Sequence, residues 1–348
     1  MNHPHEVITG GHRYNNDLLC YLQDNYKLKV LTLPRCAEIY SSWRKVYAPF
    51  VELKIIKIIK RTSVVFFGDT SYKYHLLLLL LLRLLHRGTP VVIIHHFPYL
   101  NNRGFTRIIN FIWQYVYYGL CKYIIVPSPY TRKMAENLFD KNKIIYIPLP
   151  FKKDFVISDV FEERRLLFVG TVERRKGLDY LLDSINIIKV RKPEMKFQLD
   201  IVGKIENKQF YKMLIKKAKQ YGLDNCMRFW GRVSDEQLEE LYKKAEVFTF
   251  PSLLEGYGNV LIEAMNHGVP IVAFNNSAMP FTIKNGENGL LANNEDPLAF
   301  AEKIMQISGN IELRLELQHG MKETIANVPT PNDFEEGIDA MVKRLKIN

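Results

Sequence analysis

The sequence predicts two α/β domains, each with a doubly wound parallel sheet, facing each other across a cleft. Its 348 residues suffice for two domains with separate cores. In both halves, short apolar segments rich in β-branched residues alternate with longer segments of helical spacing, which is typical of parallel sheets. Between the halves, Ile147 to Asp159 contains Pro148 and Pro150 and then polar residues, which predicts a linker.

The predicted strands follow one another at regular intervals. In the first half they are Leu28–Leu33, Ser63–Phe67, Pro90–Ile94, Lys122–Val126 and Lys143–Ile147. In the second half they are Leu166–Val169, Phe197–Val202, Met227–Trp230, Val247–Phe250 and Pro270–Phe274, with helices predicted at Gly177–Arg191, Lys208–Tyr221 and Asp235–Ala245. The predicted domains are residues 1–152 and 153–328, followed at 329–348 by a helix expected to pack back toward the first domain.

Composition excludes several classes of protein. Hydrophobic residues make up 47% and charged residues 24%, the balance of a folded globular chain. The four cysteines are far apart and form no C-x-x-C pair, which argues against a zinc site or a disulfide framework and favours a reducing cytoplasm. The N-terminus lacks the apolar segment of a secretory signal, and the leucine run at 76–85 is broken by Arg83 and too short to span a bilayer.

The charge is divided unevenly along the chain. Residues 1–150 contain 20 Lys+Arg and 8 Asp+Glu, a net charge of +12, whereas residues 151–348 contain 28 and 29, a net charge of −1. A basic half favours a polyanionic partner or an anionic membrane surface. The alternative interpretation is a solvated basic face with no specific partner.

The first candidate site follows the strand Leu166–Val169. Residues Gly170 to Gly177 include Arg174, Arg175 and Lys176 immediately before a predicted helix. Free N–H groups and the helix dipole favour an anion at such a position, so a phosphate or diphosphate fits. The segment is not a Walker loop, because the lysine precedes the glycine. A solvated basic turn is the alternative.

A stronger pattern follows the strand Val247–Phe250. Gly256 and Gly258 allow a ligand to approach the backbone closely, and Asn259 is expected to cap the next helix. The N–H groups of Val260 and Leu261 are expected to point outward at the start of that helix, forming a second anion site.

Two carboxylates bracket this second site. Glu263 lies in the first turns of the predicted helix, and its side chain leans back toward the helix start, where it can accept hydrogen bonds from ribose hydroxyls. Glu255 precedes the glycines and is expected to face whatever is attached to the phosphates.

These segments resemble the retaining, metal-independent nucleotide-sugar glycosyltransferases of the GT-B fold, grouped as glycosyltransferase family 4 or glycosyl transferases group 1. The resemblance is close over about residues 165–292 and looser in the first half. The matching stretches are Phe168–Gly170 with Lys176–Asp179, Leu199–Gly203, Gly231–Ser234, Glu255–Pro270 and Gly286–Gly289. The resemblance implies two Rossmann-like domains, with the acceptor on the first and the donor on the second.

The resemblance also implies residue roles. Lys176, helped by Arg175, would bind the donor diphosphate; Glu263 would hold the ribose; Glu255 would contact the transferred sugar. The implied donor-binding residues are Gly170, Thr171, Arg175, Lys176, Gly203, Arg232, Val233, Glu255, Gly256, Tyr257, Gly258, Asn259, Val260, Leu261 and Glu263, with Arg232 and Val233 against the base. Many members have arginine where this chain has Thr171, and either Arg174 or Arg175 would then supply the missing charge.

In the first half, Gly10 and Gly11 resemble the family's glycine loop, although only Glu6–Thr9 is available for the strand before it. His95, or else His96, resembles the histidine that approaches the donor sugar. Asp69 follows a strand and is expected to lie on the acceptor side, together with Gly10, Gly11 and His96. A histidine pair here is otherwise structural or half of a metal site, for which the sequence offers no further ligands. The expected catalytic residues are therefore Glu255, Lys176, Arg175 and His95.

Two segments of the first half combine basic and apolar residues. Val51–Arg61 places Lys54, Lys57 and Lys60 on one helical face. A second segment adds aromatic side chains to two arginines: Arg103, Arg107, Trp113, Tyr115, Tyr117 and Tyr118. Both suggest an anionic membrane surface and an acceptor carried by a lipid. The alternative is that these apolar faces simply cover the sheet.

The resulting expectation is a hexosyltransferase that moves a sugar from a nucleoside diphosphate sugar to a glycan or lipid-linked acceptor, with retention of anomeric configuration. No Asp-x-Asp pair is present, and no metal or cofactor is expected. The expected setting is cell-envelope polysaccharide synthesis in the cytoplasm, with attachment to the inner membrane face left open. The alternative is a catalytically inactive nucleotide-sugar-binding or scaffold protein. No nucleic-acid partner is expected, because a recognition motif is missing.

Overall fold

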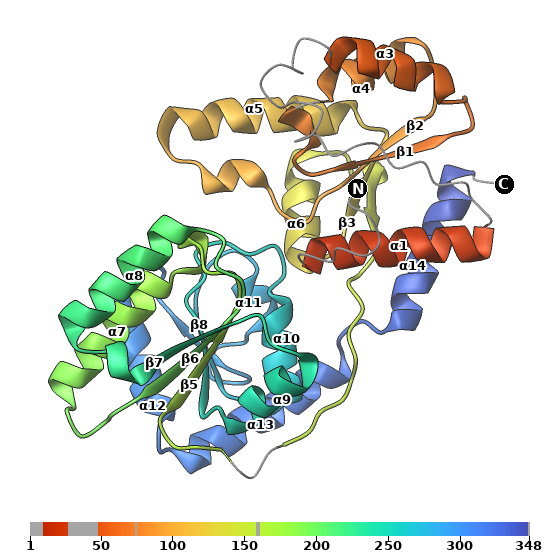
Figure 1. Cartoon of the computed structure of the whole chain (residues 1–348). Coiled ribbons are helices and arrows are strands. Elements are labelled where there is room, and N and C mark those ends of the chain that lie inside the picture. The colour runs from red at the N-terminus through yellow and green to blue at the C-terminus, as the bar shows by residue number, and fades with distance from the viewer. Residues whose placement is uncertain (1–9, 27–47, 74, 158–160, 347–348) are drawn as a thin grey trace. The chain divides into compact units, whose positions relative to one another are not determined.

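The computed structural model describes residues 10–26, 48–73, 75–157 and 161–346. The chain divides into two units, the first formed by Met1–Pro150 with Pro329–Asn348 and the second by Phe151–Val328. Each unit has a parallel sheet with helices packed on it (Figure 1). The prediction of two parallel-sheet α/β domains is therefore confirmed.

The sheet of the first unit contains four strands in the order β1 (Val64–Gly68), β2 (Thr89–Ile93), β3 (Tyr123–Val126) and β4 (Ile144–Tyr146). All three neighbouring pairs are parallel. Four of the strands predicted for this half are thus confirmed. The predicted strand Leu28–Leu33 and the short segment Glu6–Thr9 lie outside the described residues.

The helices of the first unit that the structure describes are α1 (Gly10–Tyr26), α3 (Ala48–Ile58), α4 (Leu76–Leu84), α5 (Gly104–Leu120), α6 (Pro129–Leu138) and α14 (Pro331–Leu345). Short 3-10 turns lie at Ser71–Lys73, Pro98–Asn101 and Lys141–Lys143. Alternate strand residues such as Phe67, Val92 and Ile124 join side chains of α3, α4, α5 and α6 in one buried cluster. The intervening residues, such as Ile93 and Ile125, are buried outside that cluster, because successive side chains of a strand point to opposite faces.

The C-terminal helix α14 belongs to the first unit. A capping box of Thr330 and Asp333, with a proline at the first helical position, begins it. Tyr21 and Tyr26 of α1 both donate to Asp339 Oδ1, at 3.0 and 2.8 Å. The chain thus returns to pack α14 against α1 (Figure 1).

The sheet of the second unit has the order β10-β9-β8-β5-β6-β7, and all its neighbouring pairs are parallel. The strands are β5 (Arg165–Val169), β6 (Gln198–Val202), β7 (Met227–Gly231), β8 (Val247–Phe250), β9 (Ile271–Phe274) and β10 (Leu290–Ala292). The five predicted strands are confirmed. The sequence analysis missed β10, which has only three residues and shows too little pattern to detect.

The described helices of the second unit are α7 (Leu178–Arg191), α8 (Lys208–Tyr221), α9 (Asp235–Lys244), α10 (Asn259–Asn266), α11 (Met279–Thr282), α12 (Pro297–Ile307) and α13 (Ile311–Ala326). 3-10 turns lie at Arg174–Lys176 and Asp224–Cys226. Helix α7 contacts both α8 and α12 (Figure 1). In the described part of either unit, no helix has the length and apolar character needed to cross a membrane.

Candidate functional site

The loops that follow β5, β6 and β8 meet at one edge of the second sheet, and two glycines allow this. Gly203 has φ 138°, and a Cβ there would lie 2.1 Å from the carbonyl oxygen of Gly170. Gly177 has φ 67°, and its Cβ would lie 2.0 Å from the carbonyl oxygen of Pro251. Only glycine permits both the backbone angle and the close approach at each position. The predicted Gly170 and Gly203 are therefore neighbours.

The three cations after β5 form a 3-10 turn directly before α7, as the sequence predicts. Their side chains separate. Arg174 lies over the Phe210 ring, 5.5 Å from its centroid, whereas Arg175 and Lys176 both reach Glu255. Of the two arginines proposed to replace a charge at Thr171, the structure therefore brings Arg175 and not Arg174 to Glu255.

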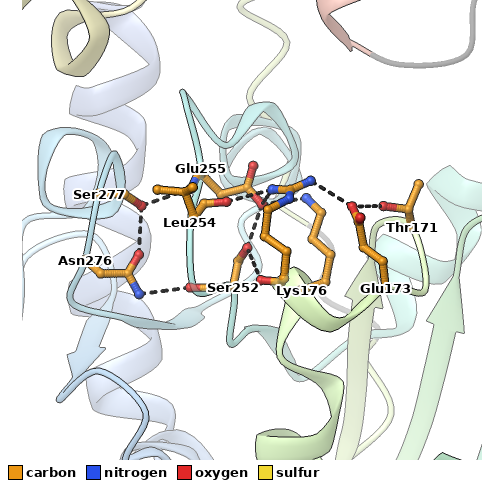
Figure 2. A network of polar contacts seen from close by, with 9 residues as sticks. Thr171, Glu173, Lys176, Ser252, Leu254, Glu255, Asn276 and Ser277 are labelled. Atoms are coloured by element: carbon orange, nitrogen blue, oxygen red, sulfur yellow. Dashed lines mark hydrogen bonds and ion pairs between the residues drawn. The ribbon is translucent and has the colours of Figure 1, made fainter. Parts of the chain in front are cut away.

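Glu255 is the centre of a network of polar contacts shown in Figure 2. Its Oε1 accepts from Lys176 Nζ at 2.5 Å, from Ser252 Oγ at 2.6 Å and from Arg175 Nη1 at 3.1 Å. The other carboxylate oxygen is directed away from Lys176 and Ser252 (Figure 2). One oxygen thus holds both cations, while the second points elsewhere.

These contacts determine the pKa values of Glu255 and Arg175. Burial raises the pKa of Glu255, but the charges of Lys176 and Arg175 and the bonds from Lys176 and Ser252 outweigh burial and lower this pKa to about 2. Burial also lowers the pKa of Arg175, yet the carboxylates of Glu255 and Glu173 raise it further, so the net shift is upward. Glu255 is therefore a carboxylate and Arg175 a guanidinium cation at neutral pH.

Glu173 holds Arg175 from the side opposite Glu255. Its Oε1 accepts from Arg175 Nη2 at 2.8 Å and from the Thr171 hydroxyl at 2.9 Å (Figure 2). Arg175 Nη1 also donates to the carbonyl oxygen of Leu254 at 2.6 Å. Thr171 thus takes part in orienting Arg175. The sequence analysis did not identify Glu173, although its place two residues after Thr171 in the same loop could have drawn attention to it.

Asn276 and Ser277, in the loop after β9, support Glu255 from the other side. The backbone N–H of Glu255 donates to Ser277 Oγ at 2.9 Å, and Ser277 Oγ donates to Asn276 Oδ1 at 2.7 Å. Asn276 Nδ2 in turn donates to the carbonyl oxygen of Ser252 at 3.0 Å (Figure 2). Sequence reasoning missed Ser252, Asn276 and Ser277. Their positions after β8 and β9 were the available signal, because the loops at the carboxyl ends of parallel strands meet at one edge.

Helix α10 begins differently from the sequence prediction. Gly258, with φ 87°, is its N-cap, and no side chain caps this end; Asn259 is the first helical residue and not the cap. A Cβ on Gly258 would lie 3.0 Å from Leu261, whose N–H donates to the Gly258 carbonyl at 2.9 Å. The N–H of Leu261 is thus engaged within the first turn, contrary to the expectation that it points outward. Val260 is the second helical residue.

Glu263, one turn into α10, accepts from the hydroxyl of buried Tyr242 of α9 at 3.2 Å. Burial and the carboxylate of Glu263 hold the pKa of Tyr242 well above its ordinary value, so the phenol stays protonated and donates. The Tyr242 ring also stacks on His267, with centroids 4.8 Å apart. Tyr242, which the sequence analysis did not identify, fixes the rotamer of Glu263.

Other expected donor residues lie on neighbouring loops. Arg232 and Val233 follow β7 and precede α9; Arg232 is exposed. Gly256 and Tyr257 lie between Glu255 and the α10 cap, and the Tyr257 ring is 5.1 Å from that of Phe151. All of these residues are in the second unit.

The first unit has its own polar cluster, at the ends of β1 and β2. Asp69 is buried, and its Oδ2 lies 2.9 Å from His96 Nδ1. Burial raises the pKa of Asp69, but the hydrogen bond and charge of His96 outweigh it, and the net shift is downward. Asp69 is thus held against His96. Among the described residues, no three His, Cys, Asp or Glu side chains are grouped as metal ligands.

His95 lies on the other side of this cluster. Its Nε2 is 2.9 Å from Asn15 Oδ1, and its ring makes an edge contact with Tyr14, with centroids 5.3 Å apart. Burial lowers the pKa of His95 to about 4, although the nearby Asp69 opposes the shift. His95 is therefore neutral at pH 7.

Gly10 and Gly11 are the first two residues of α1, so the expectation of a glycine loop is wrong for these two residues. A Cβ on Gly11 would lie 3.2 Å from Cδ2 and Cγ of His95. The role of glycine here is to let the imidazole ring approach the helix start. The structure thus brings Gly11 and His95 together, and Asp69 and His96 beside them.

Two family models match the chain. Residues 163–310 match Glycosyl transferases group 1, and residues 5–154 match Glycosyltransferase Family 4. The mannosylfructose-phosphate synthase of Agrobacterium fabrum is 28% identical over 196 residues, which are 51% of this chain and 43% of that protein. The chain spans less than half the length of the first curated relatives that it matches.

Solved structures resemble this chain over most of its length. Sucrose-phosphate synthase from Thermosynechococcus elongatus has a TM-score of 0.67 at 20% identity, covering 81% of this chain and 73% of its own. HepE of Anabaena, solved with UDP and glucose, has a TM-score of 0.69 at 14% identity, covering 84% of this chain and 81% of its own. At these identities the likeness establishes the fold.

Proposed function

The chain belongs to glycosyltransferase family 4 and has the GT-B fold, and from this premise we propose that it transfers a hexose-type sugar from a nucleoside diphosphate sugar to a glycan or lipid-linked acceptor. The observation that carries the proposal is the joining of Lys176, Arg175 and Glu255 at the edge of the second sheet. The UDP and glucose bound by HepE support a donor of this class.

The donor diphosphate binds at the start of α7 in this proposal. When the sugar leaves, negative charge develops on the diphosphate, and Lys176 and Arg175 stabilise it together with the helix N-termini. These groups take the role that a divalent cation has in metal-dependent transferases, so the proposed reaction needs no metal. Arg175 supplies the second positive charge that many family members derive from the position of Thr171.

Glu255 has two functions in the proposed mechanism. Its Oε1 holds Lys176 and Arg175 in place, and its other oxygen accepts hydrogen bonds from hydroxyls of the transferred sugar. Because the pKa of Glu255 is about 2, this carboxylate remains an acceptor throughout the physiological range. Glu263, oriented by Tyr242, accepts from the ribose hydroxyls.

Loss of the diphosphate leaves an oxocarbenium-like sugar. Glu255 positions this sugar and does not attack it, and the family resemblance supports retention of the anomeric configuration. We assign the acceptor to the first unit, where the pair of His96 and Asp69 lies at the strand ends, and we assign neutral His95 the role of approaching the donor sugar. The proposed setting is envelope polysaccharide synthesis at the cytoplasmic face of a membrane.

Nucleotide-dependent thermal stability tests the donor site first. The full chain is melted with UDP, GDP, dTDP, ADP and their common sugar conjugates; a ligand at 100 times its Kd adds about 2.7 kcal/mol. We expect one base family to raise Tm, and Glu263→Ala to abolish the shift.

Hydrolysis of the sugar conjugate that raises Tm, without added acceptor, then tests catalysis. Release of free sugar with retained configuration, read by NMR, supports a transferase. A Tm shift without any hydrolysis or transfer would instead support the alternative of an inactive nucleotide-sugar-binding protein.

A further inference from the structure

Helix α5 in the first unit is apolar on the side that faces the core and also on the opposite side. Its core side buries Tyr117 and Tyr118, each 1% exposed. On the opposite side Phe105 is 74% exposed and Trp113 49% exposed. Soluble helices normally place polar residues on the face opposite the core. A second apolar face on α5 therefore needs a partner.

The exposed residues follow helical spacing. They are Phe105, Ile108, Ile109, Ile112, Trp113 and Val116, and positions separated by three or four residues share one face of a helix. Helix α4, which contacts α5, adds exposed Leu77, Leu80 and Leu84. We call these nine residues the α4–α5 face. Several large exposed apolar side chains on two helices in contact are typical of an interaction site.

The charges around the α4–α5 face have one sign. Residues 52–122 contain 10 Lys and Arg but only two acids, Glu52 and Asp69. Both acids are buried, and both lie against histidines: Glu52 against His75 and Asp69 against His96. The exposed ionic groups described in this segment are thus basic; Arg103 is the N-cap of α5, and Arg107 lies in its first turn.

From these observations we infer that the α4–α5 face docks onto an anionic lipid surface. Apolar side chains including a tryptophan would enter the boundary between headgroups and acyl chains, while the arginines contact lipid phosphates. A second copy of the chain would bring like charges together, so charge complementarity favours an anionic surface. Docking on the lipid surface does not depend on the proposed function. Only its consequence rests on that function: docking would give the enzyme access to a lipid-linked acceptor.

The structure relocates the membrane-binding surface expected from the sequence. Tyr117 and Tyr118 are excluded because both are buried and Tyr118 donates to the Asp69 carbonyl at 2.6 Å. In α3, Ile56 is buried and Ile55 is half-buried against the core, whereas Ile58 is exposed, so two of its three isoleucines belong to the core. The lysines of α3 contribute charge near the sheet, but the exposed apolar stripe belongs to α5.

Flotation of the full chain with vesicles tests the inference. Vesicles contain phosphatidylcholine alone or with about one third phosphatidylglycerol, at low salt and at about 0.5 M salt. We expect flotation with the anionic vesicles at low salt. The double variant Ile112→Glu with Trp113→Glu should lower partitioning about tenfold or more, because two apolar anchors become charged. Arg103→Gln with Arg107→Gln should lower it about fivefold per charge removed.

Val190→Glu is the matched control, since Val190 is an exposed apolar residue on α7 of the second unit; it should float like the unchanged chain. The Tm shift that the nucleotide induces is measured on the same samples. A variant that keeps this shift is folded and has an intact donor site, so any loss of flotation reflects loss of docking. Failure of the unchanged chain to float with any vesicle, or full flotation of the double variant, would overturn the inference. So would a dimer in solution that the double variant converts to a monomer, because the face would then bind a second copy.

Discussion

The two units gather polar side chains at the same place, the carboxyl ends of parallel strands, but burial and neighbouring charges shift the pKa values of Glu255 and His95 for different reasons. In the second unit, Lys176 and Arg175 form ion pairs with Glu255, whose pKa is about 2. In the first unit, the pKa of His95 is lowered to about 4, so this ring is neutral at pH 7. The second unit therefore holds a carboxylate between two basic side chains, whereas the first holds an uncharged imidazole near the Asp69 carboxylate.

The difference has a physical origin. At the second edge, burial would neutralise Glu255 if two cations and a hydroxyl did not converge on one of its oxygens. His95 instead has Tyr14 and the start of α1 around it, and burial dominates over the attraction of Asp69. Side chains at corresponding strand ends of two similar sheets therefore differ in ionisation, because different segments pack over them.

The largest effect on activity is expected from Lys176→Ala. If Lys176 stabilises the leaving diphosphate, turnover should fall about 10- to 1000-fold. Lys243→Ala is the control, because Lys243 forms only surface ion pairs on α9. Steady-state kinetics with the donor found by thermal shift measures both variants; unchanged turnover in Lys176→Ala would contradict the assignment.

Gly203→Ala should give the largest loss of stability. The new Cβ would meet the Gly170 carbonyl at 2.1 Å in addition to the strained φ, so the free energy of unfolding should fall by about 2 to 4 kcal/mol. Gly309→Ala has a positive φ but no atom within 4 Å, and should cost only about 1 kcal/mol. Urea unfolding compares the two; equal losses would show that the contact between the loops is unimportant.

Acid should destabilise the first unit before the second. The pKa of His95 is about 4 in the folded chain against 6.5 ordinarily, so its contribution is present above pH 6.5 and is lost as the pH falls toward 4. The loss should be roughly 1 to 3 kcal/mol. Glu255, whose pKa is lowered from 4.5 to about 2, loses its contribution only below pH 4.5.

Hydrogen exchange resolved by peptide measures this difference between the units. Protection should fall first in β1 and β2 between pH 6.5 and 4, after correction for the intrinsic pH dependence of exchange. His95→Gln should remove that fall. If the second unit opens first, or the variant behaves like the unchanged chain, His95 does not control acid stability.

A smaller effect is expected from Arg175→Ala, about tenfold in kcat/KM, since Lys176 remains. Arg174→Ala is the matched control and should be near neutral, because Arg174 lies over Phe210. Adding Thr171→Arg to Arg175→Ala should restore part of the loss if Arg175 replaces the usual family arginine. Equal losses in the two single variants would refute this role of Arg175.

Much of the site could be predicted from sequence because its key residues lie in continuous segments. The turn Arg174–Lys176 and the run from Glu255 to Glu263 each follow an apolar strand and open a helix. What failed was local detail at helix starts: Asn259 does not cap α10, and Gly10 and Gly11 lie within α1. Both errors concern boundary residues, which periodicity locates poorly.

The sequence by itself determined the alternation of strands and helices, the family, the charge imbalance between halves and the position of both carboxylates. Only the tertiary structure decided that Arg175 and not Arg174 reaches Glu255, that Glu173, Asn276 and Ser277 support it, and that α5 leaves an apolar face exposed. The reason is that periodicity is a local property of the chain. The direction and charge of a side chain depend on loops that are far apart in sequence and meet only at the edge of a folded sheet.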